Sequence, residues 1–171
     1  MGAHQQDIGG YNHVNTITLK GIIDEDFINY KLPSMTLMFP TCTFKCGNDL
    51  CQNRIIAEQT NITVPITTIC DRYISNPITQ AIVFQGLEPL DSFDECLALI
   101  DCLRNTYNCK DDVVIYTGYN KEEITDKIEL LKPYGNIAIK YGRFIPNDST
   151  HMDKVIGVRL ASQNQWAEYF F

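Results

Sequence analysis

Short apolar segments recur along the chain and alternate with stretches in which apolar side chains repeat at helical spacing. Apolar runs of this length, bounded by polar or turn-forming residues, are typical of strands that are buried on both faces. We therefore predict strands at residues 35–39, 81–84, 113–116, 137–139 and 155–160.

Two amphipathic segments predict helices between the first three strands. Residues 64–75 repeat apolar side chains at helical spacing, and Thr63 is the expected N-cap. Ser92 and Glu95 have the spacing of a capping box, which predicts a helix from about residue 92 to residue 107. Each helix would connect two strands of the predicted sheet.

A third helix follows the third predicted strand. Asn120 and Glu123 open it, and it runs to about residue 131, before Pro133 and Gly135. The alternation of strands and helices favours an α/β fold with a mostly parallel sheet. A complete eight-fold barrel takes roughly 200 residues or more. The 171 residues of this chain therefore fit a partial, open barrel or an open sheet.

The composition is that of a globular, acidic chain. It has 14 Lys and Arg against 21 Asp and Glu, a net charge of −7, and 44% of its residues are hydrophobic. We expect a poorly ordered arm at residues 1–13 and a single domain over residues 14–171. The acidic charge argues against nucleic acid as a ligand. We find no secretory signal and no apolar run near the ~20 residues of a membrane span, so we expect a cytoplasmic protein without a membrane partner.

Three of the seven cysteines, Cys42, Cys46 and Cys51, lie within ten residues of one another. An odd number of cysteines without an export signal favours metal binding or redox chemistry over disulfides. Three thiolates on a short loop suit a cubane iron–sulfur cluster whose fourth iron has no protein ligand. A zinc site completed by a fourth ligand, and thiols that bind nothing, remain alternatives at this point.

Two turns are expected near the cysteines. Gly86-Leu87-Glu88-Pro89 follows the second predicted strand, and Thr117-Gly118-Tyr119 follows the third. Taken alone, the first is better explained as an ordinary turn with a solvated Glu. Its place one strand after the cysteines changes that interpretation, because the carboxyl ends of parallel strands lie at one edge of a sheet. The cysteine loop and both turns should therefore share one face.

Together these segments resemble the radical S-adenosylmethionine (SAM) superfamily, in which a three-cysteine loop follows the first strand and a Gly-Gly-Glu-Pro-like turn follows the second. More narrowly, residues 15–166 resemble the activating proteins of anaerobic ribonucleoside-triphosphate reductase. The segments that carry this narrower resemblance are Tyr116-Thr117-Gly118-Tyr119, Gly142-Arg143-Phe144 and Ser162-Gln163-Asn164-Gln165. The chain reads C-x3-C-x4-C where the family reads C-x3-C-x2-C, and Leu87 and Ala161 stand where the family has glycine.

The resemblance implies a partial, open (β/α) barrel of the radical SAM type and a 4Fe-4S cluster bound by Cys42, Cys46 and Cys51. The reduced cluster would cleave SAM, and the resulting 5′-deoxyadenosyl radical would take a hydrogen atom from a glycine of an anaerobic (class III) ribonucleotide reductase. A flavodoxin or ferredoxin would donate the electron, and no catalytic residue is implied beyond the cluster and SAM. Tyr119 would form a wall of the pocket. The implied SAM contacts are Leu50, Gly86, Leu87, Glu88, Thr117 and Gly118.

Two other functions stay open. A radical SAM enzyme that acts on a small molecule, such as a deazapurine precursor, would share the cluster and SAM, although the Y-T-G-Y and S-Q-N-Q segments argue against it. A non-catalytic interaction module that binds zinc or an iron–sulfur cluster would share only the cysteines.

Overall fold

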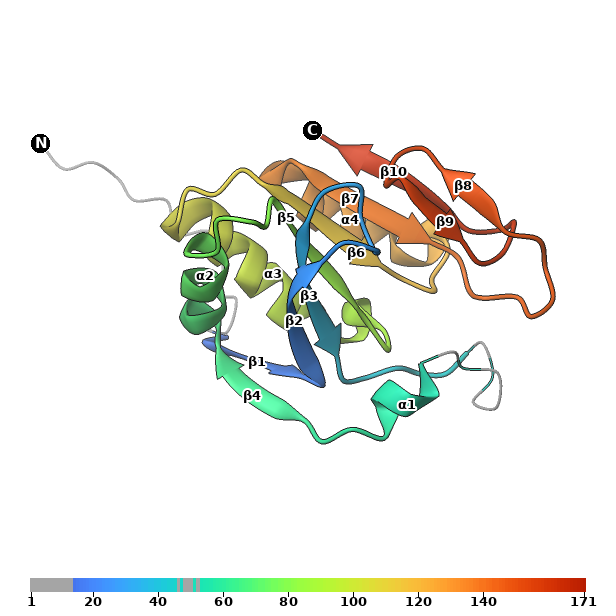
Figure 1. Ribbon diagram of the computed structural model, residues 1–171, viewed down its shortest axis with the longest axis horizontal. Helices are drawn as coiled ribbons and strands as arrows, with labels where there is room; N and C mark the ends of the chain where they lie inside the picture. Colours follow the sequence, from blue (N-terminus) through green and yellow to red (C-terminus); the bar gives the residue numbers. More distant parts are fainter. Residues whose placement is uncertain (1–13, 46, 48–50, 52) are drawn as a thin grey trace, which may run out of the picture.

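The computed structural model describes residues 14–45, 47, 51 and 53–171. Strands and helices alternate along most of this part of the chain (Figure 1). The strands are β1 (Thr16–Leu19), β2 (Gly21–Asp26), β3 (Ser34–Phe39), β4 (Ile62–Pro65), β5 (Ala81–Gly86), β6 (Asp112–Tyr116), β7 (Ile137–Tyr141), β8 (His151–Asp153), β9 (Val158–Leu160) and β10 (Trp166–Phe170). The α-helices are α1 (Arg54–Ala57), α2 (Ile66–Ile74), α3 (Phe93–Asp101) and α4 (Thr125–Leu131). Short 3-10 helices are η2 (Pro89–Ser92), η4 (Lys121–Ile124) and η5 (Lys132–Tyr134), and η3 (Cys102–Thr106) is a π-helix that continues α3.

Six of the described strands form the central sheet, in the order β10-β7-β6-β5-β3-β2. The inner strands β3, β5, β6 and β7 run parallel, while β2 and β10 pair antiparallel at the two edges. Within the described residues the two edge strands do not pair with each other, so the sheet is open. The predicted α/β fold with a mostly parallel sheet is confirmed, and its assignment as a radical SAM barrel stays a prediction.

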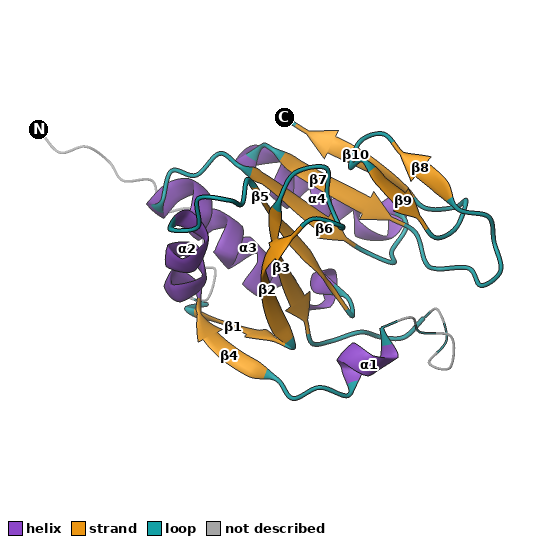
Figure 2. Cartoon of the chain, viewed as in Figure 1, coloured by secondary structure: helices purple, strands orange, loops and turns teal. Residues whose placement is uncertain are grey.

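One face of the sheet packs against α2, α3 and α4 and carries large apolar side chains (Figure 2). Successive residues of a strand point to opposite faces. Ile82 and Phe84 of β5 point to the helical side, where they belong to one core cluster with Ile69 of α2, Ile100 of α3 and Ile128 of α4. No helix in the described part of the chain combines the length and the apolarity that a membrane span requires.

The opposite face of the sheet carries smaller side chains. They leave room for the β2–β3 loop and the β8–β9 hairpin to cover this face, and the N–H of Lys31 in that loop donates to the carbonyl of Ile156 at 2.9 Å. The members of this second core cluster are Tyr30, Ala81, Val83, Val114, Ala138, Ile156, Leu160 and Ala167.

Four of the five predicted strands are confirmed as β3, β5, β6 and β7. The prediction of one strand over residues 155–160 is wrong, because a turn at residues 154–157 divides this segment and only Val158–Leu160 is strand. Gly157 lies in that turn at φ 69°, a backbone conformation that glycine adopts without steric cost.

The predicted N-cap of the first helix is wrong. Thr63 lies in β4, which pairs antiparallel with β1, and α2 begins at Ile66 after Pro65 without a side-chain cap. Thr63 does not cap the helix because its segment pairs with β1, a strand more than 40 residues away in sequence.

The predicted capping box at Ser92 and Glu95 is also wrong. The hydroxyl of Ser92 lies 3.0 Å from that of Thr41, and Glu95 accepts from the N–H of Thr18 at 3.3 Å. The chain enters this helical region through η2 instead, where the carboxylate of Glu88 accepts from the N–H of Leu90 at 3.1 Å. Both side chains of the predicted box therefore hold other segments in place.

The predicted helix opening at Asn120 is confirmed. Its N–H donates to the carboxylate of Glu123 at 2.8 Å in a complete capping box. Every contact in this motif is local, so the sequence spacing is sufficient to predict it.

Candidate metal centre and adjoining cavity

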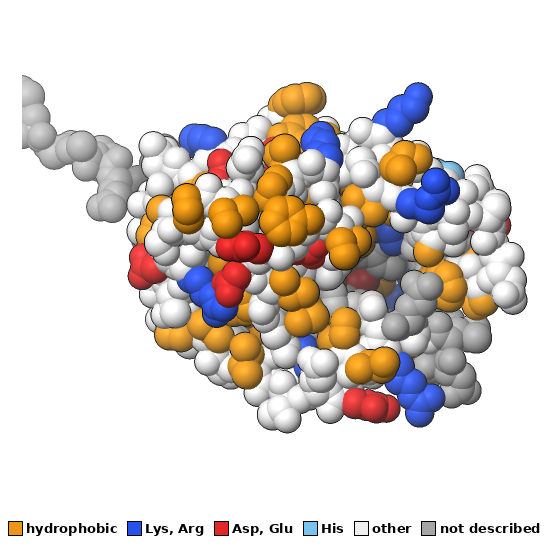
Figure 3. Space-filling model, viewed as in Figure 1, with side chains coloured by type: hydrophobic (Ala, Val, Ile, Leu, Met, Phe, Trp, Pro, Cys, Tyr) orange, Lys and Arg blue, Asp and Glu red, His pale blue; other side chains and the backbone are white. Residues whose placement is uncertain are grey.

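A cavity of about 450 Å³ lies at the carboxyl ends of the parallel strands. Figure 3 shows this face hollowed, with both basic and acidic side-chain atoms visible inside the hollow. The cysteine loop after β3 and the turns after β5 and β6 all border it. The predicted site residues that line it are Cys42, Cys51, Gly86, Leu87, Glu88, Thr117, Gly118 and Tyr119. Cys46 and Leu50 lie outside the described residues.

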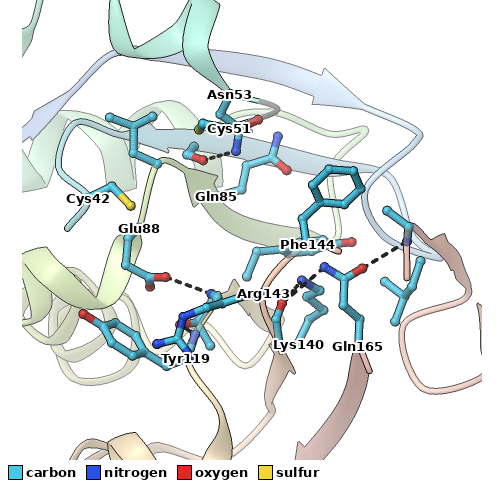
Figure 4. Close-up of a pocket in the computed structure, with 18 of the residues that line it drawn as sticks. Cys42, Cys51, Asn53, Gln85, Glu88, Tyr119, Lys140, Arg143, Phe144 and Gln165 are labelled. Atoms are coloured by element: carbon cyan, nitrogen blue, oxygen red, sulfur yellow. Dashed lines mark hydrogen bonds between the residues drawn. The ribbon is translucent and has the colours of Figure 1, made fainter. Parts of the chain in front are cut away.

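Cys42 and Cys51 are half-buried and line the same cavity, in which Figure 4 shows both side chains. The backbone N–H of Phe44, which has a φ of 51°, donates to the Sγ of Cys42 at 3.2 Å. An N–H directed at a thiolate sulfur stabilises its negative charge, and such hydrogen bonds tune iron–sulfur clusters.

These residues fit a cluster bound by the cysteine trio, because two of its thiols face one partly water-shielded space with a backbone donor at one sulfur. Among the described residues, no three His, Cys, Asp or Glu side chains gather closely enough to hold a metal ion. The middle cysteine of the trio lies outside that part of the chain.

The turn at Gly86 lies directly against the start of the cysteine loop. Gly86 has φ 110°, and a Cβ there would lie 2.6 Å from the backbone nitrogen of Phe39. The N–H groups of Leu87 and Glu88 donate to the carbonyls of Phe39 at 3.2 Å and Thr41 at 2.8 Å. Glycine thus permits a close backbone approach to the segment that leads into Cys42, and the implied contact of Gly86 with SAM stays a prediction.

The far end of the cysteine loop is tied to the same turn. The side-chain amide of Asn53, two residues after Cys51, donates to the carbonyl of Gly86 at 2.5 Å. Both ends of the loop therefore bond to one glycine turn, and Asn53 is a site residue that the sequence analysis missed.

Glu88 joins the turns that follow β5 and β6. Its side chain is buried, and its carboxylate accepts from the N–H of Gly118 at 2.8 Å and from that of Leu90 at 3.1 Å. These donors stabilise the charged form, but the effect of burial is larger and raises the pKa of Glu88 to about 7. The sequence analysis placed Glu88 in a turn of this site, and the structure gives it the role of a brace.

Thr117 and Gly118 follow β6 at the edge of the cavity. The hydroxyl of Thr117 accepts from the N–H of Tyr119 at 3.0 Å, which fixes the turn. A Cβ at Gly118 would meet the Arg143 side chain at 3.5 Å and Glu88 at 3.6 Å, which is ordinary van der Waals contact. Space alone does not require glycine at this position.

Tyr119 connects the third turn to the cysteine loop. Its hydroxyl donates to Asp91 at 2.6 Å, and the other carboxylate oxygen of Asp91 accepts from the N–H of Thr43 at 3.0 Å. The ammonium of Lys45 lies 5.1 Å from the ring centroid of Tyr119, and the guanidinium of Arg143 lies 5.5 Å from it. Tyr119 lines the cavity as predicted, and its hydroxyl bond to Asp91 was not foreseen.

Two buried polar residues that the sequence analysis did not assign to the site line the cavity from the side of β7 and β10. Lys140 donates to the carbonyl of Gly142 at 3.1 Å, and Gln165 donates to the same carbonyl at 3.2 Å. Burial lowers the pKa of Lys140 to about 8. The one sequence signal for Lys140 is a lysine inside the apolar run Ile137–Tyr141.

Arg143 of the Gly142-Arg143-Phe144 segment is paired within the chain. Its guanidinium donates to both carboxylate oxygens of Glu123, at 2.8 and 2.9 Å. The bidentate pair joins the G-R-F segment to the capping box of η4.

Fold and site together define an α/β protein with a cysteine-based metal centre at the carboxyl edge of a mostly parallel sheet. A family model described as a 4Fe-4S single cluster domain matches residues 34–165, and the chain belongs to this family. This match favours the iron–sulfur interpretation of the cysteines over the zinc interpretation. Searches of curated proteins and of solved structures found no match.

Proposed function

We propose that this chain is a radical SAM activase. It uses a 4Fe-4S cluster, bound by Cys42, Cys46 and Cys51, to cleave SAM reductively and to generate a glycyl radical on an anaerobic, class III ribonucleotide reductase in the cytoplasm. The observation that supports this best is that the cysteine loop, the Gly86–Glu88 turn and the Thr117–Gly118 turn border one cavity.

The cluster, reduced by a flavodoxin or ferredoxin, supplies the single electron that breaks the bond between sulfur and the 5′ carbon of SAM. The chain binds and orients the reactants. Gly86 and Leu87 line the cavity, so this turn can meet the amino-acid end of SAM. Glu88 uses three acceptor positions, on the N–H groups of Leu90 and Gly118 and on the hydroxyl of Thr117, and a carboxylate has about four. It therefore retains capacity to accept from the ammonium of SAM.

The cavity volume supports a nucleoside-sized ligand. Sites for small molecules and cofactors span roughly 300–1,000 Å³, and this one measures about 450 Å³. The hollow opens to the surface in Figure 3, so that a polypeptide loop carrying the glycine can approach.

The test is anaerobic reconstitution of the chain with iron and sulfide. We expect about four irons per chain as in a cubane cluster, 5′-deoxyadenosine formation that needs both reductant and SAM, and a glycyl radical signal on a class III reductase. Cys46→Ala should lose all three. Cys102→Ala is the matched control, because Cys102 is half-buried on η3 and does not line the cavity.

The outcomes separate the proposals. A loaded protein that neither binds nor cleaves SAM refutes the radical SAM assignment and leaves an iron–sulfur interaction module. Cleavage of SAM without a glycyl radical on the reductase refutes the partner and favours a small-molecule substrate.

A further inference from the structure

The residues on both sides of Cys42 are hydrogen-bonded to η2. The hydroxyl of Thr41, directly before Cys42, lies 3.0 Å from that of Ser92. The N–H of Thr43, directly after Cys42, donates to the carboxylate of Asp91 at 3.0 Å. Asp91 and Ser92 lie more than 40 residues further along the chain. The position of Cys42 is therefore set by a distant segment as well as by its own loop.

The backbone of Phe44 is strained. Its φ of 51° lies in the left-handed region, which residues other than glycine rarely adopt and keep only where the surrounding structure holds them there. In this conformation its N–H donates to the Sγ of Cys42 at 3.2 Å, and its carbonyl accepts from the N–H of Gly47 at 2.9 Å. The strain opposes the bond to the sulfur, so contacts from outside the loop are needed to keep that bond.

Asp91 and Tyr119 supply such contacts on both sides of Phe44. One carboxylate oxygen of Asp91 accepts from the N–H of Thr43, and the other accepts from the hydroxyl of Tyr119 at 2.6 Å. The ammonium of Lys45 lies 5.1 Å from the ring centroid of Tyr119, within the range of a cation–π interaction. The residues before and after Phe44 are thus both held by one pair of side chains.

The N–H of Phe44 matters for a cluster bound at Cys42. Hydrogen bonds to the sulfurs are among the features that set the reduction potential of an iron–sulfur cluster. A reduced cluster carries one more negative charge than an oxidised one, so a donor at a ligand sulfur stabilises the reduced form more. An N–H that points at the Sγ of Cys42 therefore raises the potential.

We propose that Asp91, together with Tyr119, is a positioning residue that holds the N–H of Phe44 on the sulfur of Cys42 and thereby raises the reduction potential of the cluster. The proposal rests on the cluster of the proposed function and does not depend on SAM or on the partner. Both residues act through the backbone of the cysteine loop.

The test is an anaerobic potentiometric titration of the reconstituted cluster without SAM, in which electron paramagnetic resonance follows the reduced form. Asp91→Ala removes both hydrogen bonds of the carboxylate. Asp91→Asn removes the charge and keeps an acceptor for the N–H of Thr43. Asp94 is exposed at the start of α3 and does not line the cavity, so Asp94→Ala is the matched control for loss of a nearby charge.

We expect Asp91→Ala to lower the potential. At the midpoint potential of the wild type, the ratio of reduced to oxidised cluster should fall about tenfold, which corresponds to ~59 mV for one electron. Asp91→Asn should stay at the wild-type potential or above it, because the acceptor remains and a negative charge is gone. Asp94→Ala should keep the wild-type potential. Tyr119→Phe keeps the ring beside Lys45 and loses one bond to Asp91, so its potential should fall by less than that of Asp91→Ala.

The direction of the shift decides between two roles of Asp91. If Asp91→Ala and Asp91→Asn both raise the potential, Asp91 acts only through its charge, and the proposal is wrong. An unchanged potential in Asp91→Ala shows that the loop holds the N–H of Phe44 by itself, and an equal fall in both variants shows that the acceptor does not hold it. Either result overturns the proposal.

A loss of the cluster in Asp91→Ala leaves the decision to Tyr119→Phe. A lowered potential in that variant supports the proposal, and an unchanged or raised one overturns it. A wild type that takes up no cluster overturns the proposed function itself, which distinguishes that failure from the others.

Discussion

Replacing Gly86 by alanine tests the closest backbone contact in the site. A Cβ at this position would lie 2.6 Å from the nitrogen and 2.9 Å from the oxygen of Phe39, and both are backbone atoms that cannot turn aside. The φ of 110° adds a conformation that L-residues rarely adopt. We estimate about 2 kcal/mol for the backbone conformation and about 2 kcal/mol for the overlap. Gly86→Ala should therefore lower the free energy of unfolding by about 4 kcal/mol.

The assay is thermal unfolding under anaerobic conditions, followed by circular dichroism. A change of 1 kcal/mol shifts the midpoint by about 2–4 °C in a chain of this size, so we expect a fall of roughly 10 °C. The substitution also displaces the N–H groups of Leu87 and Glu88 from Phe39 and Thr41. Bound iron per chain should therefore fall with the midpoint, because these bonds hold the start of the cysteine loop.

Gly118→Ala is the matched control. Its Cβ would make ordinary contacts at 3.5 and 3.6 Å, so its stability should stay within about 1 kcal/mol of the wild type. If Gly86→Ala unfolds at the same temperature as Gly118→Ala and keeps its iron, β3 and β5 do not approach each other as described, and the argument that glycine is needed there is wrong.

Three further predictions concern the same site. Because burial raises the pKa of Glu88 from 4.5 to about 7, the stability that its protonated form contributes is complete below pH 4.5 and is lost as the pH rises through 7. Glu88→Gln should therefore flatten the dependence of the unfolding free energy on pH between 5 and 7 in urea titrations, and an unchanged slope would contradict the shift. Tyr119→Phe removes the hydroxyl bond to Asp91 and should cost about 1 kcal/mol. Asp91→Ala also removes the bond to the cysteine loop and should cost more, so equal midpoints for the two variants would exclude a role for Asp91 in that loop. Asn53→Ala removes the hydrogen bond between the end of the cysteine loop and the carbonyl of Gly86. A chelator should therefore bleach the visible absorbance of the variant's cluster faster than that of the wild type. Equal rates of bleaching would show that this bond does not hold the loop.

The sequence was sufficient to predict the elements whose signals are local. Mostly apolar runs predicted β3, β5, β6 and β7, because strands buried on both faces need apolar side chains at most positions. The capping box at Asn120 and Glu123 is likewise a contact between near neighbours.

Elements that depend on distant partners were missed or wrongly bounded. β4 exists because it pairs with β1, so the apolar pattern around Thr63 was taken for the start of a helix. Ser92 and Glu95 have the spacing of a capping box, but their side chains bond to Thr41 and to the N–H of Thr18 in other segments. A spacing rule cannot detect such competition.

For the candidate site, chain order and the direction of parallel strands were enough to predict that the cysteine loop and two turns share one edge. That inference needs only the alternation of strands and helices, which is written in the sequence. Only the folded chain decides that Glu88 bonds across to Gly118, or that Lys140 meets the carbonyl of Gly142 inside the cavity. These contacts join different strand ends, and their geometry is set by how the strands pack, which no local pattern encodes.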